Sequence, residues 1–67
     1  MVTLTTLEDR VMDSLVLGMT VDEIATELHY SRAYIYVLLY HIRAKYGERT
    51  TFRAIARYVA ERLPVAA

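Results

Sequence analysis

Residues 20–47 have the sequence TVDEIATELHYSRAYIYVLLYHIRAKYG, which contains the signals for two consecutive helices. Its first four residues form a capping box, in which the threonine hydroxyl and the carboxylate of Glu23 each accept a hydrogen bond from the other residue's backbone amide. The apolar residues that follow at helical spacing are Ile24, Ala25 and Leu28. A short helix is therefore predicted over residues 21–28.

A longer helix is predicted after a connection of about three residues. Ser31 is a favourable N-cap because its side chain accepts a hydrogen bond from an exposed amide of the first turn. Gly47 marks the end, since glycine adopts the left-handed conformation that closes many helices. The residues that share the buried face of this helix are Ile35, Leu38, Leu39, Ile42 and Tyr46. The resulting prediction is a helix over residues 32–46.

Two further helices flank this pair. The capping box from Thr5 to Glu8 opens a helix over about residues 6–17, which ends at Gly18. Pro64 disfavours helical geometry in the residue before it, so the last helix is expected over about residues 51–63. No segment is predicted as a strand. Residues 1–67 are thus expected to form one all-α domain of four helices, with loose ends at 1–4 and 65–67.

The 67 residues carry no formal net charge, but the two signs are separated along the chain. Residues 1–31 contain six acidic side chains and one arginine, which gives a net charge of −5. Residues 32–67 contain seven basic and two acidic side chains, which gives a net charge of +5. A basic half of this kind indicates an acidic partner, of which nucleic acid is the most common.

Several classes of function are disfavoured by what the sequence lacks. It contains no cysteine, and its two histidines cannot by themselves hold a metal ion. It has neither a glycine-rich phosphate loop nor an arrangement of residues suited to acid–base catalysis. We therefore expect no enzyme activity, no cofactor, no metal and no small-molecule ligand.

The sequence also bears on localisation and assembly. No apolar run approaches the roughly 20 residues that a membrane span needs, and the first residues lack the charged start of a signal peptide. A chain of this size buries only about 60% of its unfolded surface on folding, so a partner chain would supply useful additional burial. We expect a soluble, cytoplasmic protein that forms an oligomer.

A short helix, a tight turn and a longer helix with basic flanks are typical of the helix-turn-helix unit, whose second helix lies in the DNA major groove. The chain also resembles the LuxR-type helix-turn-helix family over residues 4–63. The resemblance rests on the joint spacing of Leu4-Thr5, Glu8, Val11, Leu15, Gly18, Glu23-Ile24-Ala25, Leu28, Ser31, Ile35, Ile42, Lys45, Gly47 and Ala54-Ile55. It implies a stand-alone DNA-binding domain that regulates transcription. The promoter-binding region of bacterial sigma factors is similar over the first three helices and is the main rival family.

The resemblance assigns DNA contacts to two groups of residues. Base contacts, which relatives make through the outward face of the third helix, correspond to Tyr36, Val37 and Tyr40, with Tyr34 near the DNA backbone. Phosphate contacts correspond to Arg32, Arg43 and Lys45. Relatives usually have a lysine, an asparagine or another polar residue at positions matching Tyr36 or Tyr40, so this outward face is unusually apolar and aromatic.

The same aromatic residues permit a different function. Exposed aromatic side chains beside arginine are typical of hot spots in protein interfaces. The alternative is therefore a protein-binding module on a helix-turn-helix scaffold. In it, Tyr36, Val37 and Tyr40 contact another protein, such as part of the transcription machinery.

The last predicted helix is apolar on more than one side. One side must close the core, and the surplus is a candidate homodimer interface, which LuxR-type relatives form through this helix. We assign Ala54, Tyr58, Glu61 and Arg62 to this interface. Arg49, Arg53 and Arg57 are spaced by four and form a basic ridge on the same helix, which we interpret as solvated surface rather than a second nucleic-acid contact.

Overall fold

The computed structural model of the chain describes residues 2–63. Within this range it contains four helices and no strand: α1 (Thr6–Val16), α2 (Val21–Leu28), α3 (Arg32–Tyr46) and α4 (Thr51–Arg62). The predicted all-α fold of four helices is confirmed, and α2 and α3 have the predicted bounds. Helices α1 and α4 each end one residue earlier than predicted. None of the four helices is long and apolar enough to cross a membrane.

The two earlier helix ends have local causes. Leu17 caps α1, and Gly18 behind it has a φ of 89°, a value that residues with a side chain rarely adopt. Leu63 caps α4 with an extended backbone, at φ −71° and ψ 141°, because the residue before a proline avoids helical geometry. The predicted ranges of both helices thus included the C-cap residue, which lies just outside the helix.

Side-chain caps start all four helices. Thr5 and Thr20 each form the complete capping box with the glutamate three residues later. Ser31 and Thr50 each accept a hydrogen bond from the amide three residues later. His29 closes α2 in the left-handed conformation, with a φ of 62°. The chain therefore turns within the three residues that separate α2 from α3.

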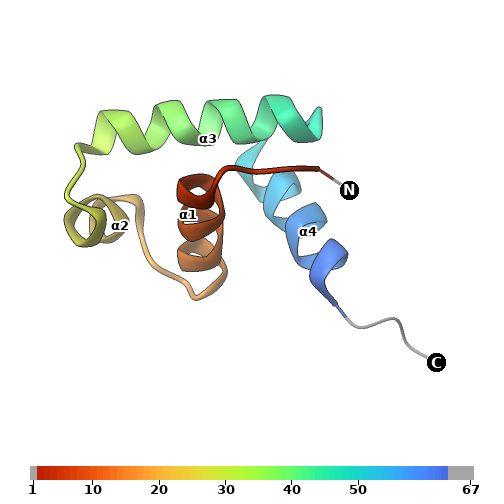
Figure 1. Cartoon of the computed structure of the whole chain (residues 1–67), viewed down its shortest axis with the longest axis horizontal. Helices are drawn as coiled ribbons and strands as arrows, with labels where there is room; N and C mark the ends of the chain where they lie inside the picture. Colours follow the sequence, from red (N-terminus) through yellow and green to blue (C-terminus); the bar gives the residue numbers. More distant parts are fainter. Residues whose placement is uncertain (1, 64–67) are drawn as a thin grey trace.

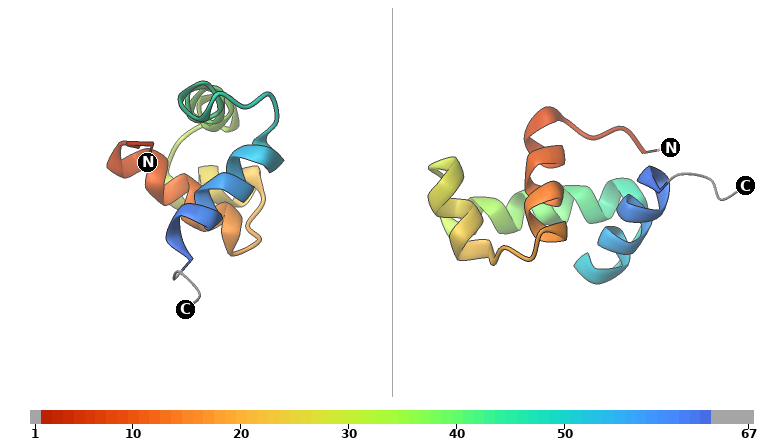
Figure 2. Two further views of the ribbon diagram at one scale, coloured as in Figure 1. Left: turned by 90° about the vertical axis from the view of Figure 1, so that its right-hand side faces the viewer. Right: turned by 90° about the horizontal axis from the view of Figure 1, so that it is seen from below.

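The longest helix, α3, lies across the other three (Figure 1). Seen along the axis of α3, helices α1, α2 and α4 all lie on one side of it (Figure 2). The core fills the space between them, and its fully buried large side chains are Val11, Met12, Ile24, Ile35 and Ile42. The opposite side of α3 is therefore left uncovered by the other described helices.

Helix α4 closes the core beside α1. Its residues Ala54 and Tyr58 are buried, and the hydroxyl of Tyr58 donates a hydrogen bond to the carboxylate of Asp13 on α1. The guanidinium of Arg62 lies 3.4 Å from the centroid of the Tyr58 ring and donates to the carboxylate of Asp9 at 3.0 Å. Burial, together with the hydrogen bond to Asp13, raises the pKa of Tyr58 to about 12. This network joins α4 to α1.

The N-terminal segment is part of the fold, so the prediction of a loose end over residues 1–4 is wrong for the residues described. Val2 and Leu4 pack against the core, and the amide of Val2 donates to a carboxylate oxygen of Glu61 on α4 at 3.0 Å. No local signal indicates this contact, because its partners lie 59 positions apart in the chain. Met1 and the other predicted loose end, residues 65–67, lie outside the described range.

Candidate nucleic-acid interface

The outward side of α3 carries large side chains that the fold does not cover. Tyr36, Val37 and Tyr40 are 53%, 46% and 63% exposed, and Tyr34 is 39% exposed. We term these four residues the outer face of α3. The residues predicted to point inward are all buried: Ile35, Leu38, Leu39, Ile42 and Tyr46. The predicted orientation of α3 is therefore confirmed, and the outer face is accessible to a partner.

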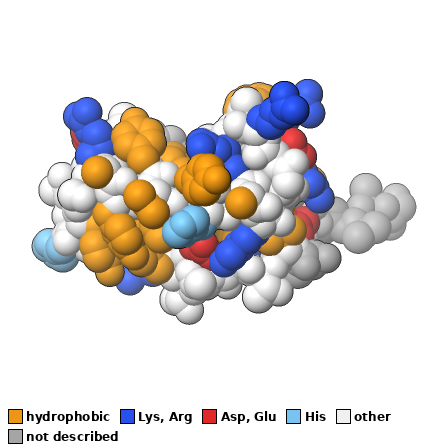
Figure 3. Space-filling model, turned by 90° about the horizontal axis from the view of Figure 1, so that it is seen from above, with side chains coloured by type: hydrophobic (Ala, Val, Ile, Leu, Met, Phe, Trp, Pro, Cys, Tyr) orange, Lys and Arg blue, Asp and Glu red, His pale blue; other side chains and the backbone are white. Residues whose placement is uncertain are grey.

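Seen from the side of α3, the molecular surface is apolar in one part and basic in another (Figure 3). Hydrophobic side chains gather over its left and centre, where α3 begins and runs, and basic side chains become more frequent toward the right. The ring of Tyr34 lies 4.8 Å from that of Tyr30, which precedes the helix. The aromatic surface thus extends slightly beyond the start of α3.

Arg32, a predicted phosphate contact, is bound by a carboxylate of its own chain. Its Nε and Nη2 donate to the two carboxylate oxygens of Asp22 on α2, at 2.5 and 2.8 Å. These hydrogen bonds, with the negative charge of Asp22, raise the pKa of Arg32 above its ordinary value. Both side chains are largely exposed to solvent, where an ion pair contributes little stability. Arg32 can reach a phosphate only after this pair opens.

Lys45, another predicted phosphate contact, compensates a buried carboxylate. Its Nζ lies 2.6 Å from Oε1 of Glu8, whose side chain is 4% exposed. Burial acts to raise the pKa of Glu8, but the hydrogen bonds from Lys45 and Thr5 and the charge of Lys45 bring it below its ordinary value. Removing Lys45 would leave the Glu8 charge buried without its partner. The geometry therefore gives Lys45 a role in the fold.

Arg43, the third predicted phosphate contact, has no carboxylate partner within residues 2–63. Its Nη1 donates to the hydroxyl of Thr51 at 3.1 Å. With Tyr40 and Arg49 it lines a surface hollow of about 280 Å³ at the end of α3. An uncompensated positive charge thus lies next to the outer face.

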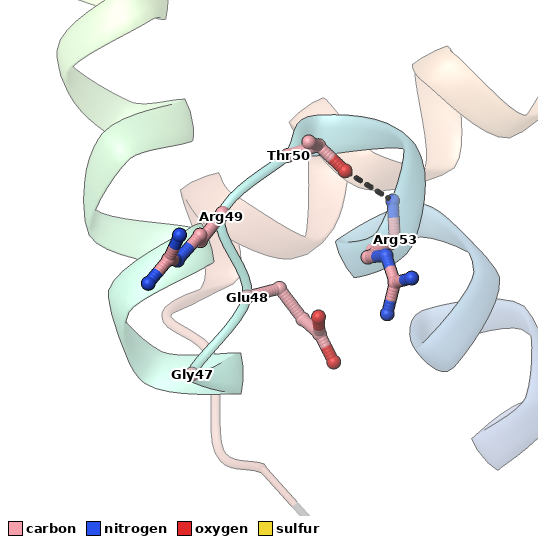
Figure 4. A pocket seen from close by; sticks show the side chains of 5 residues that line it. All are labelled: Gly47, Glu48, Arg49, Thr50 and Arg53. Atoms are coloured by element: carbon pink, nitrogen blue, oxygen red, sulfur yellow. Dashed lines mark hydrogen bonds between the residues drawn. The ribbon is translucent and has the colours of Figure 1, made fainter.

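A second hollow, of about 410 Å³, lies at the turn between α3 and α4 (Figure 4). Arg49 and Arg53 line it, and neither has a carboxylate partner in the described part of the chain. Glu48 also lines this hollow and pairs at 3.2 Å with Arg57, which donates to the carbonyl of Tyr46 as well. The predicted basic ridge is therefore divided: Arg57 serves the fold, whereas Arg49 and Arg53 remain available.

The separation of charge along the sequence is partly cancelled in the folded chain. Three ion pairs join the acidic first half to the basic second half: Asp22 with Arg32, Glu8 with Lys45, and Asp9 with Arg62. The arginines of the second half that have no carboxylate partner within residues 2–63 are Arg43, Arg49 and Arg53. All three line the two hollows. The attraction for an acidic partner is thus centred at the junction of α3 and α4.

The four residues assigned to a dimer interface are instead used within the chain. Ala54 and Tyr58 are buried in the core. Glu61 accepts the hydrogen bond from the amide of Val2, and Arg62 covers the ring of Tyr58. The assignment is corrected for Ala54 and Tyr58, which the core buries. Glu61 and Arg62 lie on the side of α4 that packs on α1 and the N-terminal segment, but they stay partly exposed.

A different line of apolar side chains remains accessible on α4. It consists of Phe52, Ala56, Val59 and Leu63, and we term it the α4 seam. Phe52 is 80% and Leu63 is 62% exposed, while Val59 is half-buried. The spacing of four, three and four residues is that of a helix face that packs along a partner helix. The α4 seam is therefore the apolar surface that α4 offers to a second chain.

One contact near this surface was not predicted. The pairing of Glu8 with Lys45 joins residues 37 positions apart, and no local pattern indicates it. The exposure of Arg49 and Arg53, by contrast, agrees with the prediction of solvated surface for this ridge. Neither arginine has an acidic residue three or four positions away in the sequence. Arg53 on α4 therefore cannot form the local ion pairs that neutralise many helical arginines, and Arg49 lies in the turn before α4.

Comparisons of the chain with models of known protein families, with curated protein sequences and with solved structures find no match.

Proposed function

We propose that the chain is a LuxR-type helix-turn-helix domain that binds double-stranded DNA and regulates transcription, with α3 in the major groove. The observation that carries this proposal is the uncovered outer face of α3, with the other three helices confined to its inner side. A recognition helix needs this arrangement, because it must enter the groove without steric interference from its own domain. The short connection between α2 and α3 also fits the helix-turn-helix unit.

The phosphate contacts in this proposal come from Arg43, Arg49 and Arg53. Their position at the junction of α3 and α4 suits a DNA backbone that passes beside this junction while α3 lies in the groove. Contacts of this kind position a protein on DNA and make its binding dependent on salt. Arg32 can add a contact at the other end of α3 if its exposed pair with Asp22 opens.

The proposal is tested by measuring fluorescence anisotropy of labelled duplex DNA at several salt concentrations. We expect binding at low salt that weakens steeply as salt increases. Arg49→Ala should weaken binding to all sequences and reduce the slope of log affinity against log salt by about 0.9, the value for one phosphate contact. Arg10→Ala, which removes the same charge from the exposed surface of α1, should leave the slope unchanged. Failure to bind any duplex at low salt would contradict the proposal.

A second candidate function is binding of another protein through the outer face. It is favoured by the aromatic character of this face and by the internal pairing of Arg32 and Lys45. Binding of this kind should depend little on salt, and Tyr40→Ala should weaken it by about 2 kcal/mol or more if Tyr40 is a hot spot. A pull-down with the transcription machinery, in parallel with the DNA titrations, distinguishes the two functions.

The proposed DNA-binding form is a homodimer that assembles through the α4 seam. A twofold axis would place two copies of α3 on successive major grooves of one side of the DNA. The half-sites would then lie about one helical turn, roughly 34–36 Å, apart. The expected DNA site is a short inverted repeat.

A further inference from the structure

The middle of the outward side of α3 carries no side chain that can form a two-point hydrogen bond with a base. Ala33, Val37, Tyr40 and Ala44 follow one another at spacings of four, three and four, and all four are exposed. Helix α3 contains no Asn, Gln, Ser, Thr, Asp or Glu at any position. The amide and carboxylate groups that recognise adenine or cytosine are therefore missing from this helix.

The cationic side chains of α3 do not provide such a two-point hydrogen bond either. Nε and Nη2 of Arg32 donate to the carboxylate of Asp22. Lys45 donates to Glu8, and Arg43 donates to Thr51 on α4. The paired N–H groups with which an arginine binds guanine are thus engaged within the chain. Tyr36 and Tyr40 each offer one hydroxyl, and the exposed His41 beside Tyr40 offers an imidazole. Each of these groups can make a single hydrogen bond to a base but not a two-point contact.

Apolar side chains can still distinguish base pairs, because thymine is the one base with a methyl group in the major groove. Ala33 and Ala44 are small and allow the helix backbone to come close to the base edges. Val37 lies between them and presents two methyl groups at 46% exposure. We propose, as an extension that rests on DNA binding, that α3 recognises thymine methyl groups, with Val37 as the central contact.

The direct test replaces thymine by uracil, which keeps base pairing and phosphates but removes the methyl group. The probe is the duplex of highest affinity selected from a random pool by the full chain. Each contacted methyl group should contribute about a fourfold change in affinity, the value for burying one carbon of this size. We expect single substitutions at contacted positions to weaken binding about fourfold, and complete substitution to weaken it tenfold or more with the salt slope unchanged.

Two valine variants identify the contact. For each substituted position, we compare the affinity for the thymine duplex with that for the uracil duplex. In Val37→Ala this ratio should fall close to one for at least one thymine of the selected duplex. Val16→Ala on α1 is a matched control, since Val16 is 47% exposed, and it should leave every ratio as in the parent. Circular dichroism melting of both variants verifies that each is folded. An unchanged ratio at every position in Val37→Ala would overturn the assignment of Val37.

The failure of this inference and the failure of DNA binding itself give different results. If no duplex binds at low salt, the proposed function is wrong and methyl recognition falls with it. If duplexes bind tightly and with the expected salt dependence, but thymine and uracil forms bind within twofold of each other, methyl recognition alone is overturned.

Discussion

Glu8 shows how one side chain can start a helix and also fix its position in the fold. Its Oε1 accepts a hydrogen bond from the amide of Thr5 at 2.8 Å and another from Nζ of Lys45 at 2.6 Å. The first contact caps α1, and the second joins the start of α1 to the last turn of α3. A carboxylate that is almost fully buried is tolerated here because it has both a cationic partner and backbone donors.

We predict that the stability of the chain depends on pH through the ionisation of Glu8. Its pKa in the fold lies below the ordinary value of 4.5, so its stabilising contribution is complete above about pH 4.5. The contribution is lost as the pH falls through the lowered pKa, because protonation then favours the unfolded chain. Glu8→Gln should lower the free energy of unfolding by about 1–3 kcal/mol at pH 7 and by less at pH 3.

Urea unfolding of the parent and the variant at both pH values checks this prediction. Glu27→Gln is a suitable control, since Glu27 is exposed on α2 and should change stability little at either pH. An equal loss of stability in Glu8→Gln at pH 7 and pH 3 would show that the charge of Glu8 is not what stabilises the fold.

At the scale of elements, the end of α3 depends on the backbone of Gly47. This residue has a φ of 68°, and the amides of Gly47 and Glu48 donate to the carbonyls of Ala44 and Arg43. The closure stops α3 just before the turn that carries Arg49. The conformation of Gly47 therefore positions the arginine cluster relative to the outer face.

We predict that Gly47→Ala lowers the free energy of unfolding by about 1–2 kcal/mol, the cost of left-handed geometry for a residue with a side chain. A β-carbon at this position has no heavy atom within 4 Å, so the effect isolates backbone strain from steric overlap. Gly47→Asn should cost less, because asparagine adopts this conformation more readily. Chemical unfolding of both variants provides the measurement, and equal losses for alanine and asparagine would exclude this explanation.

At the level of assembly, the α4 seam is the surface through which two copies of the chain would associate. The interior of the chain already uses Ala54 and Tyr58, so a substitution such as Tyr58→Asp would disrupt the core rather than report on a dimer. Phe52, by contrast, contributes little to the monomer because most of its side chain is in solvent. Its exposure is the strongest single indication of a partner surface on α4.

We predict that the parent chain sediments at micromolar concentration with twice its mass of 7.7 kDa. Phe52→Asp should give a folded monomer, because a charge in the seam would have to be buried at the dimer interface. Leu17→Asp is a matched control, since Leu17 is 81% exposed at the end of α1, and it should remain dimeric. A parent chain that sediments as a monomer would contradict the dimer.

Local signals in the amino-acid sequence are sufficient to predict the four helices and the inward side of α3. Caps such as Thr20, Ser31 and Gly47 act within three or four residues, and helical periodicity fixes which side chains share a face. These signals are local, so they can be recognised without knowledge of the rest of the chain. The orientation of the outer face followed from the same periodicity.

Which charged and apolar side chains remain available to a partner depends on how the helices pack in space. Lys45 pairs with Glu8, 37 positions away in the chain, and Tyr58 donates a hydrogen bond to Asp13, 45 positions away. Arg49 and Arg53 remained because no carboxylate of residues 2–63 pairs with them. The physical reason is that an ion pair or a buried contact depends on distance in space, which the packing of α1 against α3 and α4 sets.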